Sequence, residues 1–221
     1  MLLFAVSCST TEQISAPLLE FEPDAELIAA VPQCSLNSRS PAVAAFCLHE
    51  FALIEQRAGN TEKAIDLFRQ VLEIDAERAD VYESLGDIYL GEEDLQQARA
   101  AYRSAIEIGT SSPKSYNNVG AIHDRLGDLD TAIADYQQAI QLDPDNARIH
   151  YNLGSAYVRN GEQFELAIAE FRRAVELDPS LASAYYDLGQ IYEHLGEDLL
   201  ADAAYHSAAN LGHEPAIEKL R

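Results

Sequence analysis

The feature that most constrains the fold of this chain is an internal repeat of 34 or 35 residues. Glycines recur at this interval, at Gly86, Gly120, Gly154 and Gly189. Alanines recur with almost the same spacing, and an aromatic residue follows each of them four positions later. The alanines are Ala64, Ala98, Ala132, Ala167 and Ala201, and the aromatic residues are Phe68, Tyr102, Tyr136, Phe171 and Tyr205. Self-similarity at a fixed period of this length is typical of a repeat architecture.

Each repeat contains the pattern of two amphipathic helices joined by a turn. In YNLGSAYVRNGEQFELAIAEFRRAVELDP, apolar residues have helical spacing on both sides of a central Asn-Gly pair. The final Asp-Pro pair predicts the end of the second helix, because the residue before proline disfavours the α region. The small residues Gly154 and Ala167 predict that the two helices approach closely, with Tyr157 and Phe171 filling the remaining space. One pair cannot bury both of its apolar faces, so successive pairs are expected to stack.

These positions resemble the tetratricopeptide repeat. An aromatic residue or a histidine stands four positions before each of the four repeated glycines. A tyrosine or a histidine stands three positions after each of them. The first set is Tyr82, Tyr116, His150 and Tyr185, and the second set is Tyr89, His123, Tyr157 and Tyr192. The resemblance implies an all-α, right-handed α-solenoid of five repeats, at residues 45–78, 79–112, 113–146, 147–181 and 182–215. Repeat 1 departs from the pattern, with Ala52 in the glycine position and Glu55 in the tyrosine position.

The two ends of the chain do not follow the repeat. Three prolines, Pro17, Pro23 and Pro32, interrupt residues 9–40, which are expected to form a tether before a solenoid at residues 41–221. Ser40 and Pro41 suit a helix N-cap followed by proline at the first helical position, so the first long helix is expected to begin there. Residues Pro215–Arg221 are expected to form a short helix that covers the last repeat with Ile217 and Leu220.

The first eight residues carry a possible export signal. LLFAVSC resembles the cleavage box of bacterial lipoproteins, in which the final cysteine is diacylated, and Cys8 is therefore the lipidation candidate. Two features depart from that family: Ala5 stands where leucine is usual, and no Lys or Arg precedes the apolar residues. The resemblance implies a periplasmic protein, with Ser9 favouring release to the outer membrane. The alternative is a cytoplasmic protein with an apolar N-terminus.

The cysteine count bears on the same question. The chain has three cysteines, and an odd number in an exported protein suggests that one thiol has another use. Lipidation of Cys8 would leave Cys34 and Cys47 as a candidate disulfide that pins the tether to the first repeat. The alternative is that Cys47 is a small buried residue and that Cys34 is a free thiol in a loop.

Charge and motif content narrow the functional class. The formal net charge of -22 repels phosphate backbones and anionic lipids, so nucleic acid is not expected as a partner, nor a membrane except through an anchor at Cys8. The nearest approach to a metal pair is Cys47 with His49, which would point to different sides of a helix. No cofactor, metal site or catalytic group is predicted, and an enzyme with its site in the groove is the less favoured alternative.

The resemblance implies a protein-binding scaffold whose groove is lined by the first helix of each repeat. The phase of the repeat puts the following residues on or near that face: Lys114, Asn117, Asn118, Arg125, Arg148, Tyr151, Asn152, Ser155 and Arg159. Repeat 5 has six acidic residues and no Lys or Arg, whereas repeat 4 has four arginines against five acidic residues. We therefore expect a protein or peptide segment with acidic and apolar side chains to bind across repeats 3 and 4, with Tyr151 as packing anchor and Arg148 as charged contact.

Two alternatives to this binding site follow from the same residues. The cations of repeats 3 and 4 would then only neutralise neighbouring acidic repeats, and the partner would use the convex face or the N-terminal tether. The chain also lacks the two-carboxylate clamp of chaperone-binding relatives, since Ser183 and Asp187 stand where that arrangement needs basic residues. A cytoplasmic adaptor or co-chaperone is the alternative within the same functional class.

Overall fold

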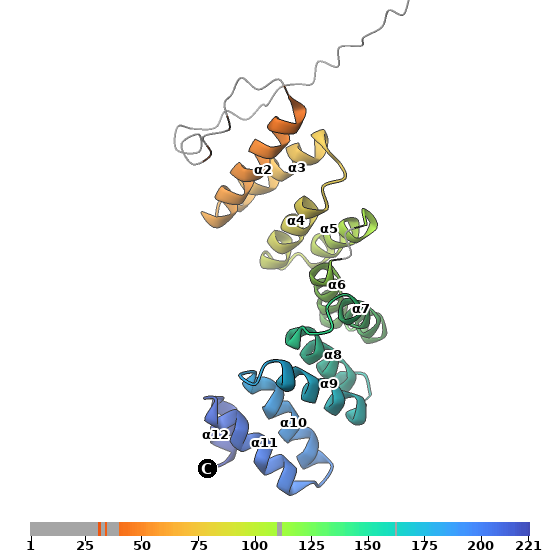
Figure 1. Ribbon diagram of the computed structural model, residues 1–221, viewed down its shortest axis with the longest axis vertical. Coiled ribbons are helices and arrows are strands. Elements are labelled where there is room, and N and C mark those ends of the chain that lie inside the picture. The colour runs from red at the N-terminus through yellow and green to blue at the C-terminus, as the bar shows by residue number, and fades with distance from the viewer. Residues whose placement is uncertain (1–30, 32–33, 35–39, 110–111, 162) are drawn as a thin grey trace, which may run out of the picture. The chain divides into compact units, whose positions relative to one another are not determined.

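A computed structural model describes residues 31, 34, 40–109, 112–161 and 163–221. Within these residues the chain forms eleven α-helices and no strand, and the first ten helices are paired in chain order (Figure 1). The all-α fold of paired helices expected from the repeat is therefore confirmed. Cys8, the segment 1–8 and most of the expected tether 9–40 lie outside the described residues.

Each repeat consists of a first and a second helix. The first helices are α2 (Pro41–Arg57), α4 (Ala79–Gly91), α6 (Pro113–Leu126), α8 (Ala147–Arg159) and α10 (Ala182–His194). The second helices are α3 (Thr61–Ile74), α5 (Leu95–Glu107), α7 (Leu129–Leu142), α9 (Phe164–Leu177) and α11 (Asp198–Asn210), and the short helix α12 (Glu214–Lys219) follows. The chain divides into two compact units, Met1–Asp75 and Ala76–Arg221.

The first unit holds the degenerate first repeat. Helix α2 begins at Pro41 with Ser40 in the N-cap position, as the sequence predicts. Glu55, which replaces the usual tyrosine, is only 6% exposed. Its carboxylate accepts a hydrogen bond of 2.5 Å from the Asn60 amide and lies 3.8 Å from the Lys63 ammonium. These partners stabilise a buried charge that would otherwise be costly.

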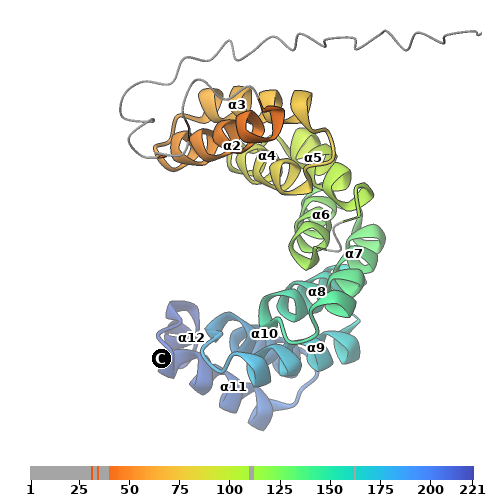
Figure 2. The same ribbon diagram turned by 45° about the horizontal axis from the view of Figure 1, so that its top comes forward.

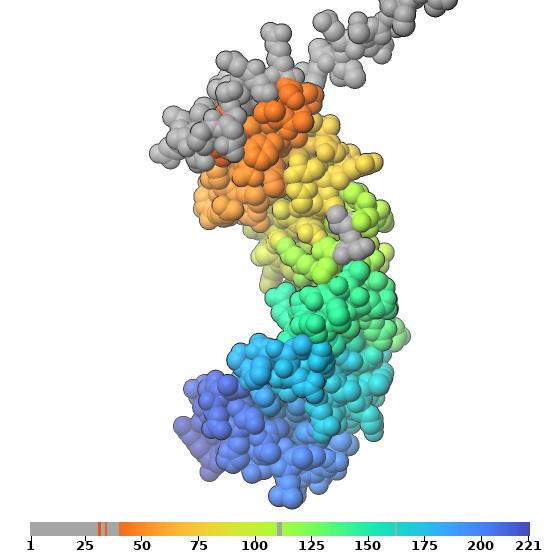
Figure 3. Space-filling view, viewed as in Figure 1, coloured from red at the N-terminus to blue at the C-terminus, as the bar shows by residue number. Residues whose placement is uncertain are grey.

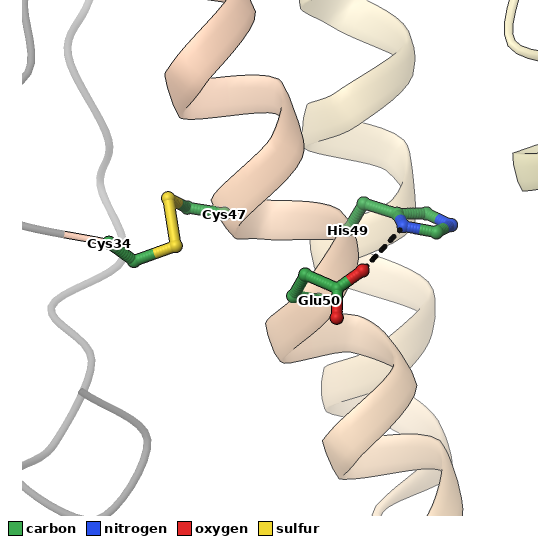
Figure 4. Close-up of a disulfide and its surroundings, with 4 residues drawn as sticks. All are labelled: Cys34, Cys47, His49 and Glu50. Atoms are coloured by element: carbon green, nitrogen blue, oxygen red, sulfur yellow. Dashed lines mark ion pairs between the residues drawn. A yellow bond between two sulfur atoms is a disulfide. The ribbon is translucent and has the colours of Figure 1, made fainter. Parts of the chain in front are cut away.

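A disulfide ties the segment before α2 to this helix. Cys34 and Cys47 are bonded, with their Cα atoms 5.5 Å apart, and both are buried, as is Val31. Cys47 projects from α2 towards Cys34, whereas His49 projects from the other side of the helix (Figure 4). His49 instead lies with its ring 5.8 Å from that of Phe68 and its Nδ1 3.5 Å from the Glu50 carboxylate. Cys47 and His49 therefore do not converge.

The second unit contains repeats 2 to 5, and a glycine–aromatic contact closes each helix pair. A Cβ atom added to Gly154 would lie 2.9 Å from the ring of Phe171, which is closer than side-chain atoms pack. Equivalent pairs join Gly86 to Tyr102, Gly120 to Tyr136 and Gly189 to Tyr205. Protein interiors are packed at crystal-like density, so only glycine allows this separation of the two helices.

The pairs of the second unit stack in chain order. The second helix of each repeat packs against the first helix of the next, as α5 on α6, α7 on α8 and α9 on α10 (Figure 2). A continuous core extends from Ala132 in α7 to Tyr205 in α11. The space-filling view shows the same succession within this unit, from green to dark blue (Figure 3). Stacking thus buries the faces that one pair leaves exposed.

The C-terminal helix caps the last repeat, although in a different register from the one predicted. It begins at Glu214 and ends at Lys219. Ala216 is fully buried, Leu220 packs on the core, and Ile217 is only partly buried. Ala216 therefore takes the buried position expected for Ile217, and α12 begins at Glu214, one residue before the predicted start at Pro215.

Candidate functional site: the first-helix face of repeats 2 to 5

The first helices α4, α6, α8 and α10 are connected side by side through polar side chains, and this surface is called the first-helix face. Asn152 of α8 donates a hydrogen bond of 2.8 Å to the side-chain oxygen of Asn117 in α6. Asn117 donates to Asn118 at 3.3 Å, and Asn118 donates to the Tyr102 hydroxyl at 2.9 Å. Tyr102 in turn donates to the Asp87 carboxylate of α4 at 2.6 Å. This chain of hydrogen bonds connects three successive repeats.

Tyr102 is the buried donor at the centre of that chain. Burial raises the pKa of its hydroxyl far above the usual value, and the hydrogen bond to Asp87 raises it further. The hydroxyl therefore remains protonated and donates to Asp87 at any physiological pH. A second contact between α4 and α6 lies nearby, where the Ser115 hydroxyl donates to the Glu83 carboxylate at 2.6 Å.

Three of the four cations predicted on this face are ion-paired with the preceding repeat. Lys114 pairs with Asp87, Arg159 pairs with Asp124, and Arg125 lies 3.9 Å from the Glu93 carboxylate. The Arg159 guanidinium also donates to the backbone carbonyl of Asp124 at 3.2 Å. Exposed ion pairs of this kind contribute about 0–1 kcal/mol each to the free energy of unfolding. Their main effect is therefore to neutralise charge on this face.

Arg148 is the fourth of these cations. Its side chain is exposed and forms no ion pair with any residue in the described part of the chain. It lies on α8 one turn before Tyr151, and residues three or four apart share a helix face. Arg148 is therefore a positive group that can accept a carboxylate from outside this chain.

Tyr151 lies half-buried beside it and contacts both its own repeat and the next. Its ring is 5.6 Å from that of Phe171, at an angle of 46°. Burial raises the pKa of its hydroxyl to about 12, and the nearby Asp187 carboxylate contributes to the rise. The Ser155 hydroxyl donates a hydrogen bond of 3.0 Å to the backbone carbonyl of Tyr151. The hydroxyl of this predicted site residue is therefore used within its own helix.

The structure separates the predicted site residues into two groups. Asn117 and Asn118 are 4% and 8% exposed, and their amides are used in the hydrogen-bond chain together with that of Asn152. The exposed members of the set are Lys114, Arg125, Arg148 and Arg159. A partner can reach the cations and the outer edge of Tyr151, whereas the asparagines hold the face together.

A cluster around Asp187 on α10 was not among the predicted site residues. Burial raises the pKa of its carboxyl, against the opposing effects of a hydrogen bond from Tyr151 and the nearby His213. The His213 ring stacks on Tyr186 with centroids 4.6 Å apart. Asp187 is 36 residues from Tyr151, close to one repeat, and that spacing was a usable signal. His213 follows the last repeat and has no periodic equivalent.

Two further histidines occupy packing positions. His123 and His150 are buried, and each Nδ1 lies within hydrogen-bond distance of a second-helix carboxylate, at 2.7 Å from Asp135 and 2.6 Å from Glu170. The residues described by the structure contain no group of three or more side chains arranged to hold a metal ion. None of the described helices has the length and apolar character needed to cross a bilayer.

Family models match most of this chain. Models described as TPR repeat or tetratricopeptide repeat match residues 48–111, 125–161, 162–196 and 182–211. The chain belongs to the tetratricopeptide-repeat family, whose members are protein-binding scaffolds. No curated protein sequence is similar enough to match it.

Solved structures share the fold. MamA superposes with a TM-score of 0.69 at 24% identity, over 75% of this chain and 96% of MamA. YrrB, described as a TPR protein with an unusual peptide-binding site, gives 0.69 at 20% identity, over 88% of this chain and 95% of YrrB. PilF from Pseudomonas aeruginosa gives 0.67 at 23% identity, over 77% of each chain.

Proposed function

We propose that this chain binds an extended or helical segment of a partner protein across the first-helix face of repeats 3 and 4. The observation that carries the proposal is the contrast between Arg148 and the other cations of that face. Lys114, Arg125 and Arg159 pair with carboxylates of the preceding repeat, while Arg148 is exposed beside the half-buried Tyr151. A partner carboxylate would pair with Arg148, and an adjacent apolar side chain would pack on Tyr151.

The test uses the partner captured from cell membranes and identified by mass spectrometry. Arg148→Glu combined with Tyr151→Ala is expected to weaken its binding at least tenfold and to leave the helical circular dichroism signal intact. The matched control is Arg103→Glu, which makes the same charge change at an exposed position of the second helix α5. Unchanged affinity of the double variant, or an equal loss in the control, contradicts the proposed site.

We also propose that the protein acts in the cell envelope, held by a lipid on Cys8. The disulfide between Cys34 and Cys47 supports an oxidising compartment, since such bonds are rare in the cytosol. The structural similarity to PilF, and to PilW, described as a type IV pilus biogenesis factor, agrees with a role in assembling envelope complexes. A cytoplasmic adaptor is the competing assignment.

Two measurements separate these locations. The protein expressed from its own gene is expected to incorporate labelled palmitate, and Cys8→Ala is expected to abolish the label. Alkylation of freshly lysed cells without reductant is expected to miss Cys34 and Cys47, whereas alkylation after reduction modifies both. Equal labelling of the Cys8→Ala variant contradicts the anchor, and free thiols at Cys34 and Cys47 favour the cytoplasmic assignment.

A further inference from the structure

Four leucines of repeats 4 and 5 are exposed near the turns that join first and second helices. Leu195 follows α10 directly and is 43% exposed, while Leu199 and Leu200, in the first turn of α11, are 88% and 44% exposed. Leu166, 48% exposed, holds in α9 the position that Leu200 holds in α11, because each directly precedes a buried alanine of the repeat. These four residues are called the leucine edge.

A direct contact places the two turns on one edge of the second unit. The ring of Phe164, at the start of α9, lies 4.8 Å from the ring of His194, at the end of α10. Leu195 is adjacent to His194, and Leu166 is two residues after Phe164, so the contact brings the turns that carry these leucines next to each other. The turns between α8 and α9 and between α10 and α11 can be followed in Figure 1.

The leucine edge is separate from the packing that holds the repeats together. The core of repeats 4 and 5 uses Ala167, Phe171, Ala201 and Tyr205, which are at most 5% exposed. Single exposed leucines are ordinary on protein surfaces, but several on one edge mark an interaction surface. A partner that covers these leucines removes apolar surface from water, which favours binding.

Charge around the leucine edge restricts what can cover it. Four exposed carboxylates border the leucines: Glu165, Glu197, Asp198 and Asp202. Repeat 5, residues 182–215, contains no Lys or Arg. A second copy of this chain would bring like charges together, since each copy has a formal net charge of -22.

We propose that the leucine edge docks an amphipathic helix of a partner protein, with Lys or Arg residues bordering the apolar face of that helix. The apolar face would cover Leu195, Leu199 and Leu200, and the basic residues would meet the carboxylates of α11. This surface lies at the turns of repeats 4 and 5, and its occupation does not require the first-helix face. One scaffold would then hold two segments.

The test uses the full chain and a fluorescent synthetic peptide of leucine and lysine, patterned as an amphipathic helix. Its affinity is measured by anisotropy at physiological ionic strength. Leu195→Gln with Leu199→Gln is expected to weaken binding at least tenfold. Leu211→Gln is the matched control, because Leu211 is also 43% exposed but lies at the other end of α11, and its affinity is expected to equal that of the wild type. Urea unfolding checks that all variants fold.

Four results would overturn the proposal. They are the absence of binding to the wild-type chain, equal affinity of the edge variant and the wild type, equal binding of a leucine–glutamate peptide, and self-association that the edge variant abolishes. The third result means that charge plays no part, and the fourth means that a second copy is the occupant. Arg148→Glu is expected to leave the affinity for this peptide unchanged, so failure here is distinguishable from failure of the first-helix site.

Discussion

Asn152 donates a hydrogen bond of 2.8 Å to Asn117 in the preceding repeat. Asn117 lies one position before the residue that is equivalent to Asn152 in that repeat. The pair joins α8 to α6 and continues through Asn118 and Tyr102 to Asp87 on α4. Asparagines from nearly equivalent positions of successive repeats are therefore partners in the stack. The first-helix face is built on them, and Tyr151 lies next to Asn152 in α8.

Asn117→Ala is expected to lower the free energy of unfolding by about 1–3 kcal/mol, because the side-chain oxygen of Asn118 loses its donor and the side-chain NH2 of Asn152 loses its acceptor. Urea unfolding followed by circular dichroism measures the change. The control is Asn210→Ala, since Asn210 is exposed at the end of α11 and its replacement should stay within about 0.5 kcal/mol of the wild type. Equal stability of the two variants would show that the asparagine chain contributes nothing.

Gly154→Ala is expected to destabilise the chain by about 1–3 kcal/mol, because the new Cβ would lie 2.9 Å from the Phe171 ring. Gly91→Ala offers a matched control, since Gly91 is also helical and has nothing within 4 Å of the added atom. Ala has a higher helix propensity than Gly, so this control should be neutral or stabilised by up to about 1 kcal/mol. Thermal unfolding measures the stability of both variants against the wild type. Stabilisation by Gly154→Ala would contradict the close contact between the two helices.

Reduction of the disulfide between Cys34 and Cys47 is expected to destabilise the first unit by about 2–4 kcal/mol, since the bond closes a short loop. Hydrogen exchange should accelerate in α2 and α3 on adding dithiothreitol and stay unchanged in α8 to α11. A chain with Cys34→Ala and Cys47→Ala should exchange quickly in α2 with or without reductant. Sensitivity of that double variant to reductant would point to a different cause.

Asp187→Asn is expected to stabilise the chain at neutral pH and to have less effect in acid. The pKa of Asp187 is raised by burial in the folded state, so the native chain binds this proton more tightly than the unfolded chain. The associated stability is fully present below the unfolded pKa and is lost as pH rises through the folded pKa. Asp135 has a raised pKa from the same cause and remains in both chains, so the difference between variant and wild type isolates Asp187. Urea midpoints between acid and neutral pH test this; an equal effect across the range would contradict it.

The sequence was informative about contacts inside a repeat and weak on contacts between repeats. The meeting of Gly154 with Phe171 was predictable because both residues lie in one helix pair and their positions recur in every copy. The burial of Asn117 was not predictable from helical phase alone, since a position on the inner face can either meet a partner or bond to its own neighbour. The ion pair of Lys114 with Asp87 joins residues 27 positions apart, which a search at the full repeat period does not detect.

The exposure of the leucine edge was not predictable from the sequence, for a related reason. Leu199 and Leu200 open the second helix of a repeat, where apolar residues suit a packed helix, and no local signal separates a covered leucine from an exposed one. Only tertiary packing decides, and it leaves both leucines exposed. The register of α12 depended in the same way on tertiary packing, which buries Ala216 rather than Ile217.

The central proposal, that a partner segment lies on the first-helix face at Arg148, is tested most directly by photo-crosslinking in living cells. Benzoylphenylalanine is introduced at position 148 in α8 or, as a control, at the exposed position 169 in the second helix α9. The expected result is a covalent adduct of one partner protein from position 148 and none from position 169. An adduct from position 169 without one from position 148 would place the partner on the second-helix side and contradict the proposed site.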